Sequence, residues 1–493
     1  MSSQTSKPDL EVSSKHLEAQ DKVPSKDEGQ ELLTDADAER KLVWKCDLHV
    51  IPMITLLFFL AFLDRTNIGN AKIQGMTEDL HMSGSDYNIA LFVFFIPYIL
   101  FEVPSNIILK RIAPSTWLAL LMVLWGIATI GQGLVRNVQG LIACRFLLGL
   151  FEAGLFPGCT YLISMYYKRY ELQRRMSFFF LGSILAGAVS GLLAFGIANM
   201  AGVGGYGAWR WIFILEGLLT IVVALVAKLY VPDWPETASF LNEADRRLLL
   251  ARLAADVGEA RMDTLDKDAR RRIFRDWKIY VGTVMYFGVV NTGYAGSFFI
   301  PTIIKQMGYK AEEAQARTIP IYVVATALCL CTAYLADRLK HRYAFTIFGL
   351  CVATVGYILL LCQQHVSVGA KYFALFLIVS GGYSTQPVAL GWLANNMSGH
   401  YKRSVSAGMQ IGLGNLGGIV ASNVFLSREE PLYWTGYGVS LGLLWLCAAA
   451  CTALFLGVRR ENRRRDRGER DHRLAERDVG NMGDDHPRWR FTT

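Results

Sequence analysis

Charged side chains are scarce in this sequence of 493 residues. Asp, Glu, Lys and Arg make up 19% of it, whereas 52% of the residues are hydrophobic. The mean hydropathy is positive, at +0.28, which is unusual for a soluble domain. The formal net charge of +8 does not indicate nucleic-acid binding, because the basic residues gather between apolar runs and near the C-terminal end. We therefore expect no nucleic-acid partner.

The sequence also lacks the signatures of an enzyme. It contains no G-x-x-x-x-G-K-[ST] phosphate-binding loop. A G-x-S-x-G match at 438–442 lies inside an apolar run, whereas a nucleophile elbow joins a strand to a helix. Cys329 and Cys331 are two residues apart, so they point to different faces of a helix and do not form a metal pair. We expect no catalytic residue, no cofactor and no metal site.

Histidine is almost absent from the apolar runs, where only His49 stands at the edge of the first. Proton transfer within these segments would therefore have to use carboxyl groups. The nine cysteines lie in or beside the apolar runs and indicate no disulfide framework.

Long apolar runs are what the sequence has in abundance. About 20 apolar residues suffice for a helix to cross a hydrocarbon core of ~30 Å, and backbone groups in lipid must be satisfied within the helix. The runs predict an all-α membrane protein with twelve transmembrane helices in two six-helix bundles of pseudo-symmetric arrangement. The expected spans are 48–66, 86–108, 116–134, 138–160, 176–199, 209–231, 279–301, 318–336, 343–362, 372–396, 404–426 and 432–458.

The segments around these spans define five regions. The short loops that would face the cytoplasm carry most of the loop Lys and Arg, which favours cytoplasmic termini. The charged C-terminal tail is expected to be solvated near anionic lipid; a specific regulatory docking role is the alternative. The regions are a disordered N-terminal tail (1–45), an N-terminal bundle (46–231), a cytoplasmic linker with an amphipathic helix (232–278), a C-terminal bundle (279–458) and a basic tail (459–493).

In one stretch, FLAFLDRTNIGNAKI (59–73), charged residues directly follow an apolar run that is hydrophobic enough to lie in lipid. A charged residue near the bilayer centre costs about 2.5–3.5 kcal/mol on insertion scales, so such residues face a partner or a water-filled cavity. The pair Asp64 and Arg65 therefore marks a substrate or ion pathway, with Asn67 beside it. The alternative is a self-compensating pair at a cavity mouth.

The other deep ionisable residues also belong to the N-terminal half. Arg145 and Glu152 share one helix face with Gly149, at i, i+7 and i+4. Glu152 is a candidate proton carrier; for Arg145 the alternative to substrate binding is a neutralising ion pair. Glu102 and Glu216 are more typical of structural contacts. The C-terminal half offers only neutral polar groups within its spans: Asn291, Tyr294, Gln386, Gln410 and Asn415.

Five motifs together carry a resemblance: FLDRTNIGNAK (62–72), FEVPSNIILKRIAPSTWLA (101–119), RFLLGLFEAGLFPG (145–158), WRWIFILEGLLT (209–220) and VPDWPE (231–236). Over about residues 45–460 the chain resembles a major facilitator superfamily transporter of the anion:cation symporter family, in particular the fungal allantoate, nicotinate and pantothenate permease group.

The resemblance implies alternating access and assigns roles to residues. It places proton coupling on Asp64 and Glu152 and anion binding on Arg65, with Arg145, Tyr98 and Asn415 at the site. Asn67, Tyr294 and Gln386 complete the expected substrate-binding set. In LADRLKHR (335–342), Asp337 and Arg338 are expected to form gating ion pairs.

The predicted function is proton-coupled uptake of a small organic anion, a vitamin-like monocarboxylate such as nicotinate or pantothenate, or an allantoate-like compound. The alternatives are an exporter of a fungal metabolite with the same fold and a nutrient-sensing receptor that does not transport. The expected partners are the anion, protons and the lipid bilayer. We expect a monomer, multi-pass in the plasma membrane, with both termini cytoplasmic.

Overall fold

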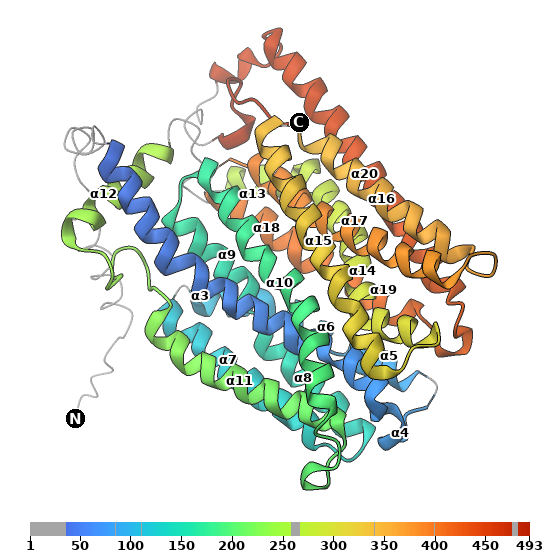
Figure 1. Cartoon of the computed structure of the whole chain (residues 1–493). Coiled ribbons are helices and arrows are strands. Elements are labelled where there is room, and N and C mark those ends of the chain that lie inside the picture. Colours follow the sequence, from blue (N-terminus) through green and yellow to red (C-terminus); the bar gives the residue numbers. More distant parts are fainter. Residues whose placement is uncertain are drawn as a thin grey trace, which may run out of the picture.

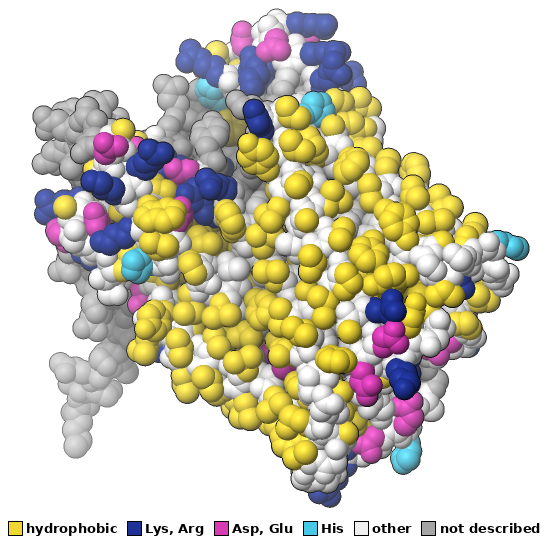
Figure 2. All heavy atoms as spheres, in the orientation of Figure 1, with side chains coloured by type: hydrophobic (Ala, Val, Ile, Leu, Met, Phe, Trp, Pro, Cys, Tyr) yellow, Lys and Arg dark blue, Asp and Glu magenta, His cyan; other side chains and the backbone are white. Residues whose placement is uncertain are grey.

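The computed structural model describes residues 36–83, 85–109, 111–257, 267–339, 341–398, 400–475 and 482–493. Helices form all the regular secondary structure of these residues, as the sequence predicts, and most run side by side through one bundle (Figure 1). Hydrophobic side chains cover the middle of the visible surface, while charged side chains gather at its two ends (Figure 2). Such a belt is expected of a protein whose outer surface faces lipid.

The N-terminal helices, as we call α3 to α11, come first. They are α3 (Ala36–Ala71), the π-helical turn η1 (Lys72–Met76), α4 (Thr77–Asp79), α5 (Asp86–Phe92), α6 (Phe95–Leu109), α7 (Pro114–Leu134), α8 (Val138–Glu152), α9 (Leu155–Tyr166), α10 (Arg169–Ala198), the 3-10 turn η2 (Val203–Gly205) and α11 (Ala208–Tyr230). Helix α3 begins at Ala36, within the segment 1–45 that we expected to be disordered; residues 1–35 lie outside the described residues.

Two linker helices follow, α12 (Glu243–Val257) and α13 (Lys267–Arg275). The C-terminal helices, α14 to α20, complete the bundle. Their bounds, with the short turns among and after them, are α14 (Trp277–Gln306), α15 (Ala311–Leu339), α16 (Arg342–Leu361), α17 (Val368–Asn395), α18 (His400–Gly414), α19 (Leu416–Val424), η3 (Ser427–Glu429), α20 (Trp434–Asp466), η4 (Asp471–Ala475) and η6 (Gly483–Asp485).

Eleven helical segments of the described residues are long and apolar enough to cross a membrane. The eleventh expected span, 404–426, is interrupted at Asn415 and divides into α18 and α19, so neither piece reaches the required length. The interruption stands among glycines, in the sequence GLGNLGG (412–418), which lowers the intrinsic helix propensity of this stretch.

Small residues allow the helices to approach closely. In the N-terminal set, α11 packs along α7, where a Cβ at Gly217 would lie 2.8 Å from the carbonyl oxygen of Gly126. The two sets of helices meet where α10 packs on α15 and where α3 packs on α14. At the first of these contacts Gly187 faces the Tyr322 ring, at 2.4 Å from its ideal Cβ position. Substituting such glycines would separate the helices.

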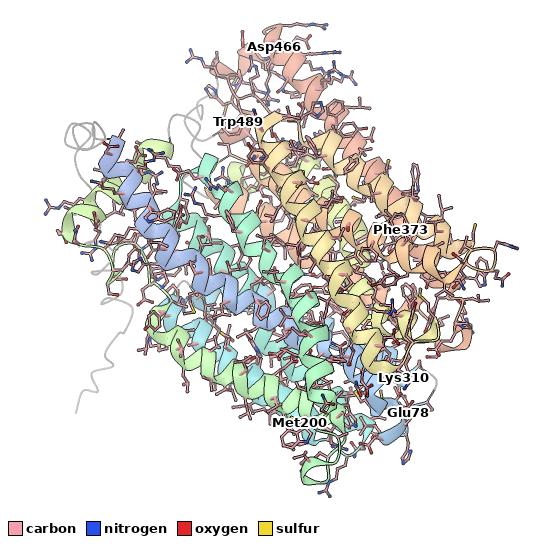
Figure 3. All side chains as sticks on the ribbon, viewed as in Figure 1. Glu78, Met200, Lys310, Phe373, Asp466 and Trp489 are labelled. Atoms are coloured by element: carbon pink, nitrogen blue, oxygen red, sulfur yellow. The ribbon has the colours of Figure 1, made fainter. Side chains whose placement is uncertain are left out.

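The end of the bundle at which α3 begins and α20 ends also carries α12 and α13; we call it the linker face. Asp466 and Trp489 mark it in Figure 3, whereas Glu78, Met200 and Lys310 lie at the other end, the opposite face. Ion pairs fasten α12 to the linker-face ends of the N-terminal helices. The guanidinium of Arg252 is buried and binds Glu39 on α3, at 2.6 Å, and Glu171 on α10.

Residues 482–493 form the end of the chain beyond the charged run 459–478. They fold back on the linker face, where the Trp392 Nε1 donates to the Thr492 carbonyl at 3.0 Å. Asp484 is completely buried and binds Lys278 on α14 at 3.0 Å and Lys402 on α18 at 2.8 Å. Burial opposes ionisation of Asp484, but the two ammonium groups outweigh it and hold its pKa well below the ordinary value.

On the opposite face the two sets of helices are joined by polar contacts. Gln74 in η1 donates to Gln315 on α15 at 3.0 Å, and Lys305 on α14 donates to the Ile73 carbonyl at 3.2 Å. Lys72 pairs with Glu430 at 3.4 Å. The bundle is therefore closed at this end.

Candidate functional site

A small pocket, here the central pocket, lies between the N-terminal and C-terminal helices. Its volume is about 30 Å³, enough for only one or two water molecules. Five of the predicted substrate-binding residues line it: Arg65, Tyr98, Tyr294, Gln386 and Asn415. Residues far apart in the sequence thus meet at one point, and both halves of the chain contribute.

Arg65 is the charged group of the central pocket and is 4% exposed. Its guanidinium lies 4.8 Å from the Phe94 ring centroid and 4.9 Å from that of Tyr98, within the range of a cation–π interaction. Its Nη1 donates to the Tyr294 hydroxyl, which in turn donates to Asn415 Oδ1 at 3.1 Å. This chain of hydrogen bonds connects α3 to α14 and to the interruption between α18 and α19.

Glu152 occupies the other side of the Arg65 guanidinium. Its Oε1 accepts from Arg65 Nη2, and its Oε2 has no hydrogen-bond partner among the described residues. Two glycines near Glu152 allow α8 and α9 to pack closely against α6. A Cβ at Gly149 would lie 2.0 Å from the Phe94 carbonyl oxygen, just before α6, and a Cβ at Gly154 would lie 1.9 Å from Ser105 Oγ on α6. The ion pair of Glu152 is thus with Arg65 on α3, and no ion pair with Arg145 on its own helix is present among the described residues.

Asp64 points away from Arg65, into the N-terminal helices. Its Oδ2 accepts from Trp125 Nε1 at 3.1 Å and from Thr220 Oγ1 at 2.9 Å, while its Oδ1 has no partner among the described residues. Consecutive residues on an α-helix point about 100° apart, so the side chains of Asp64 and Arg65 face different parts of the protein. Asp64 does not line the central pocket.

Two further predicted residues also lie outside the lining of this pocket. Asn67 donates to the carboxylate of Glu216 on α11, and its own Oδ1 lies 3.5 Å from Ser190 Oγ. Arg145 is 1% exposed and lies 6.0 Å from the Phe213 ring centroid. Its Nε and Nη2 have no hydrogen-bond partner in the described part of the chain.

The remaining predicted residues belong to the C-terminal helices. Gln386 on α17 reaches the pocket because Gly293 has no side chain: a Cβ there would lie 2.5 Å from the Gln386 Nε2. Arg338 is exposed near the end of α15. The side chain of Asp337 lies outside the described residues, so the expected gating ion pairs stay a prediction.

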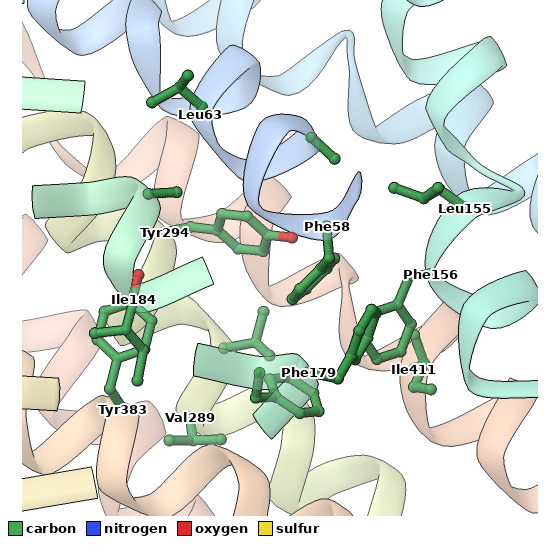
Figure 4. Packing of buried hydrophobic residues seen from close by; sticks show 14 of the residues in the cluster. Phe58, Leu63, Leu155, Phe156, Phe179, Ile184, Val289, Tyr294, Tyr383 and Ile411 are labelled. Atoms are coloured by element: carbon green, nitrogen blue, oxygen red, sulfur yellow. The ribbon is translucent and has the colours of Figure 1, made fainter. Parts of the chain in front are cut away.

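Sequence reasoning missed most of the apolar lining of the central pocket. Aromatic side chains of α3, α9 and α10 form it, and Phe58 and Phe156 pack with centroids 5.3 Å apart, beside Phe179 (Figure 4). Phenylalanines are equally common on a lipid-facing surface, so their pattern alone carries no signal for a pocket. The further lining residues are Phe62, Phe180, Ser183, Tyr286, Val290 and Ile411.

A much larger cavity, here the vestibule, extends from the linker face into the bundle. Its volume is about 650 Å³, and the linker-face ends of α9, α10, α17 and α18 contribute to its walls. Three side chains, Phe156, Phe180 and Ile411, line both the vestibule and the central pocket and therefore separate them. With the opposite face closed, the vestibule gives the interior access from one side only.

Deep within the described N-terminal helices, carboxyl groups outnumber guanidinium groups. The buried carboxyl groups are those of Asp64, Glu102, Glu152 and Glu216, and the buried arginines away from the helix ends are Arg65 and Arg145. Burying an unpaired carboxylate is costly. Such an excess is stable only if some of these carboxyl groups carry a proton or meet another cation.

Comparison with known proteins agrees with this architecture. The family model described as Major Facilitator Superfamily matches residues 54–422. Curated relatives are named as transporters. MFS transporter prlL of a fungal species (strain NRRL 50135) is 36% identical over 87% of this chain and 88% of its own length. MFS-type transporter cnsO of Penicillium expansum is 33% identical over 92% of this chain and 90% of its own length.

Solved structures share the fold at low sequence identity. A bacterial homologue of the human lysosomal transporter Spinster, in an inward-facing and occupied conformation, has a TM-score of 0.63 at 16% identity, covering 83% of this chain and 96% of that one. The proton:xylose symporter XylE bound to 6-bromo-6-deoxy-D-glucose has a TM-score of 0.65 at 16% identity, covering 83% and 94%. The chain therefore belongs to the Major Facilitator Superfamily of membrane transporters.

Proposed function

We propose that this protein is a proton-coupled symporter of a small organic anion, of the anion:cation symporter type, that takes up a vitamin-like monocarboxylate or an allantoate-like compound. One observation carries the proposal: the cation that would bind the substrate, Arg65, is already bound by a protonatable group, Glu152. An anion and a proton must then arrive together, because the anion can reach Arg65 only when Glu152 is neutralised.

The coupling follows from the geometry around Arg65. A proton on Glu152 removes the charge that holds the guanidinium, and a substrate carboxylate takes its place in a bidentate contact. Tyr294 and Asn415 then bring the C-terminal helices to the bound anion, since they already form a hydrogen-bonded chain with Arg65. Asp64 is the second candidate proton site, with Trp125 and Thr220 stabilising its charged form.

The orientation of the protein belongs to the same proposal. Basic loops favour a cytoplasmic linker face, which makes this conformation inward-facing, with the vestibule open to the cytoplasm. The membrane potential favours uptake when the protons carried exceed the negative charge of the anion, because each net positive charge moved inward gains about 2.3 kcal/mol per 100 mV. We place the protein in the plasma membrane as a monomer with both termini cytoplasmic.

The test is uptake of labelled nicotinate, pantothenate, biotin, allantoate and small dicarboxylates by cells that express the protein. It compares about pH 5 with about pH 7.5, with and without a protonophore. We expect saturable uptake of one class, stronger at acid pH and abolished by the protonophore. If the protein reaches the cell surface and none of these anions is taken up, the proposal is wrong.

Glu152→Gln tests the coupling residue within the same assay. The variant has no carboxyl group paired with Arg65, so we expect loss of accumulation against a gradient, with exchange of labelled for unlabelled substrate retained. Glu313→Gln is the matched control, because Glu313 is an exposed carboxylate that pairs with Arg317 at the surface. Accumulation by Glu152→Gln as strong as by the unchanged protein would exclude Glu152 as the coupling residue.

A further inference from the structure

Glu216 on α11 is a buried carboxyl group that the proposed anion cycle does not use. It is 2% exposed and lines neither the central pocket nor the vestibule. Its Oε2 accepts from the Asn67 side chain on α3, and its Oε1 has no hydrogen-bond partner in the described part of the chain. A purely structural contact, which the sequence favours for this residue, leaves the second oxygen unexplained.

The surroundings of Glu216 supply no positive charge. Helix α7, which packs along α11, has no charged residue, and the charged residues of α10 lie near its linker-face end. Lys72 in η1 pairs with Glu430, and on α3 the ionisable group within electrostatic reach of Glu216 is Asp64, a second carboxyl group. No ion pair joins Glu216 to any residue that the structure describes. Because a buried carboxyl group without a cation is stable only when neutral, Glu216 holds a proton in this conformation.

A chain of hydrogen-bonding side chains leads from Glu216 to the opposite face. Ser190 Oγ on α10 lies 3.5 Å from Asn67 Oδ1 and accepts from Asn70 Nδ2 at 2.5 Å. Asn70 stands at the end of α3, just before η1, whose contacts with α14 and α15 close this face. We call Asn70, Ser190 and Asn67 the polar path; each is at most 3% exposed, and none lines the central pocket or the vestibule. Opening of the opposite face would bring water to Asn70.

Carboxyl groups also lead from Glu216 toward the central pocket. Asp64 and Asn67 are three residues apart on α3 and share one face of it, and their partners on α11, Thr220 and Glu216, are four residues apart. The two contacts therefore lie on adjacent turns. Asp64 is within electrostatic reach of both Glu216 and Glu152. Two hydrogen-bond donors stabilise the charged form of Asp64, so it is available to accept a proton.

We propose, on the basis of the proposed function, that the proton and the anion reach the Arg65–Glu152 pair by different routes: the anion between the two sets of helices, and the proton through the N-terminal helices by way of Glu216. Glu216 gives its proton to Asp64, which passes a proton on to Glu152 as the anion takes Arg65. Each donor becomes a carboxylate and each acceptor an acid. Glu216 then takes a new proton from the solution at the opposite face, along the polar path.

A pair of backgrounds separates proton delivery from structure. The readout is exchange of labelled for unlabelled substrate, with the anion that the uptake panel identifies. Glu216→Gln keeps an acceptor for Asn67 but holds no proton, so we expect exchange to slow about tenfold or more. In Glu152→Gln residue 152 is always neutral and needs no proton, so adding Glu216→Gln should change exchange less than about twofold. An equal loss in both backgrounds would make Glu216 a structural residue and overturn the proposal.

Ser190→Ala interrupts the polar path without altering a titratable group. We expect uptake to fall about tenfold at about pH 7.5 and much less at about pH 5, because a higher proton concentration speeds reprotonation of Glu216. Thr354→Ala is the matched control, since the Thr354 hydroxyl donates to the Leu350 carbonyl of its own helix, α16. If Ser190→Ala loses the same fraction of uptake at both pH values, the polar path does not carry the proton.

Infrared spectroscopy of the purified full-length protein tests the proton on Glu216 without transport. A protonated carboxyl group has a carbonyl band that a carboxylate lacks. At about pH 7.5, well above the ordinary glutamate pKa, this band should be weaker in Glu216→Gln and unchanged in Glu313→Gln, whose exposed carboxylate pairs with Arg317. An unchanged band in Glu216→Gln would overturn the proposal. The weaker band in a protein that takes up none of the anions would instead refute the proposed function, while the proton site stands.

Discussion

Removing the charge of Asp484 should release the C-terminal segment 482–493 from the linker face. Asp484→Asn leaves Lys278 and Lys402 with one carboxylate between them, because Asp276 lies 2.9 and 2.6 Å from their ammonium groups. Breaking a buried ion pair costs about 3–5 kcal/mol. Since Asp276 remains, we expect the lower end, about 3 kcal/mol, which corresponds to about a hundredfold change in the docking equilibrium.

Hydrogen–deuterium exchange of the purified full-length protein measures this equilibrium directly. Amides of 485–493 should exchange about a hundredfold faster in Asp484→Asn, with little change in the amides of α14. Asp466→Asn is the matched control: its carboxylate pairs with Arg490 at 2.8 Å, but both side chains are largely exposed, at 62% and 45%. An exposed pair contributes at most about 1 kcal/mol.

The docking should also depend on pH in a defined direction. The pKa of Asp484 is lower in the folded protein than in an unfolded chain. Its contribution is therefore complete above the ordinary aspartate pKa, about 3.9, and is lost as the pH falls through the lower, folded value. If segment 482–493 exchanges at the same rate in Asp484→Asn as in the unchanged protein at neutral pH, the buried ion cluster does not hold it and the reasoning fails.

Two further predictions concern the packing of the bundle. Gly149→Ala places a Cβ 2.0 Å from the Phe94 carbonyl oxygen, so we expect a loss of about 1–3 kcal/mol and a lower melting temperature in detergent, whereas Gly196→Ala, with open space around it, should melt as the unchanged protein does. A crosslink formed by a bifunctional thiol reagent between cysteines introduced at Gln74 and Gln315, whose side-chain amides hydrogen-bond at 3.0 Å on the opposite face, should stop transport; undiminished transport by the crosslinked variant would show that this contact does not open.

Hydropathy and loop charge were enough to predict the helices, because each crossing has to satisfy its backbone internally and so appears as a long apolar run. The exception is instructive. The expected span 404–426 is broken at Asn415 by a local glycine-rich sequence, and hydropathy averaged over a window of about 19 residues does not register such a break. The interruption matters because it places the Asn415 side chain against Tyr294.

The site was only partly predictable. Buried charge singled out Arg65 and Glu152, which do pair, since charge in an apolar run is rare and conspicuous. Which of two neighbouring charges faces the pocket depends on helix rotation, and the sequence does not reveal that Asp64 turns toward Trp125. The docking of 482–493 was likewise hidden, because a segment rich in charge is typical of a solvated tail until its partners are known.

The side chains of Phe156, Phe180 and Ile411 lie between the central pocket and the vestibule. Their rotation and the rearrangement of whole helices are two motions with different timescales. Rotation of side chains takes picoseconds to nanoseconds when they are exposed and longer when they are packed, whereas rearrangement of whole helices takes microseconds to milliseconds. Passage between the central pocket and the vestibule requires only the first kind of motion, because side chains alone stand in the way. Opening of the opposite face requires the second, since it has to break contacts between helices. For the proposed cycle we therefore expect exchange of molecules with the vestibule to be fast compared with opening of the opposite face.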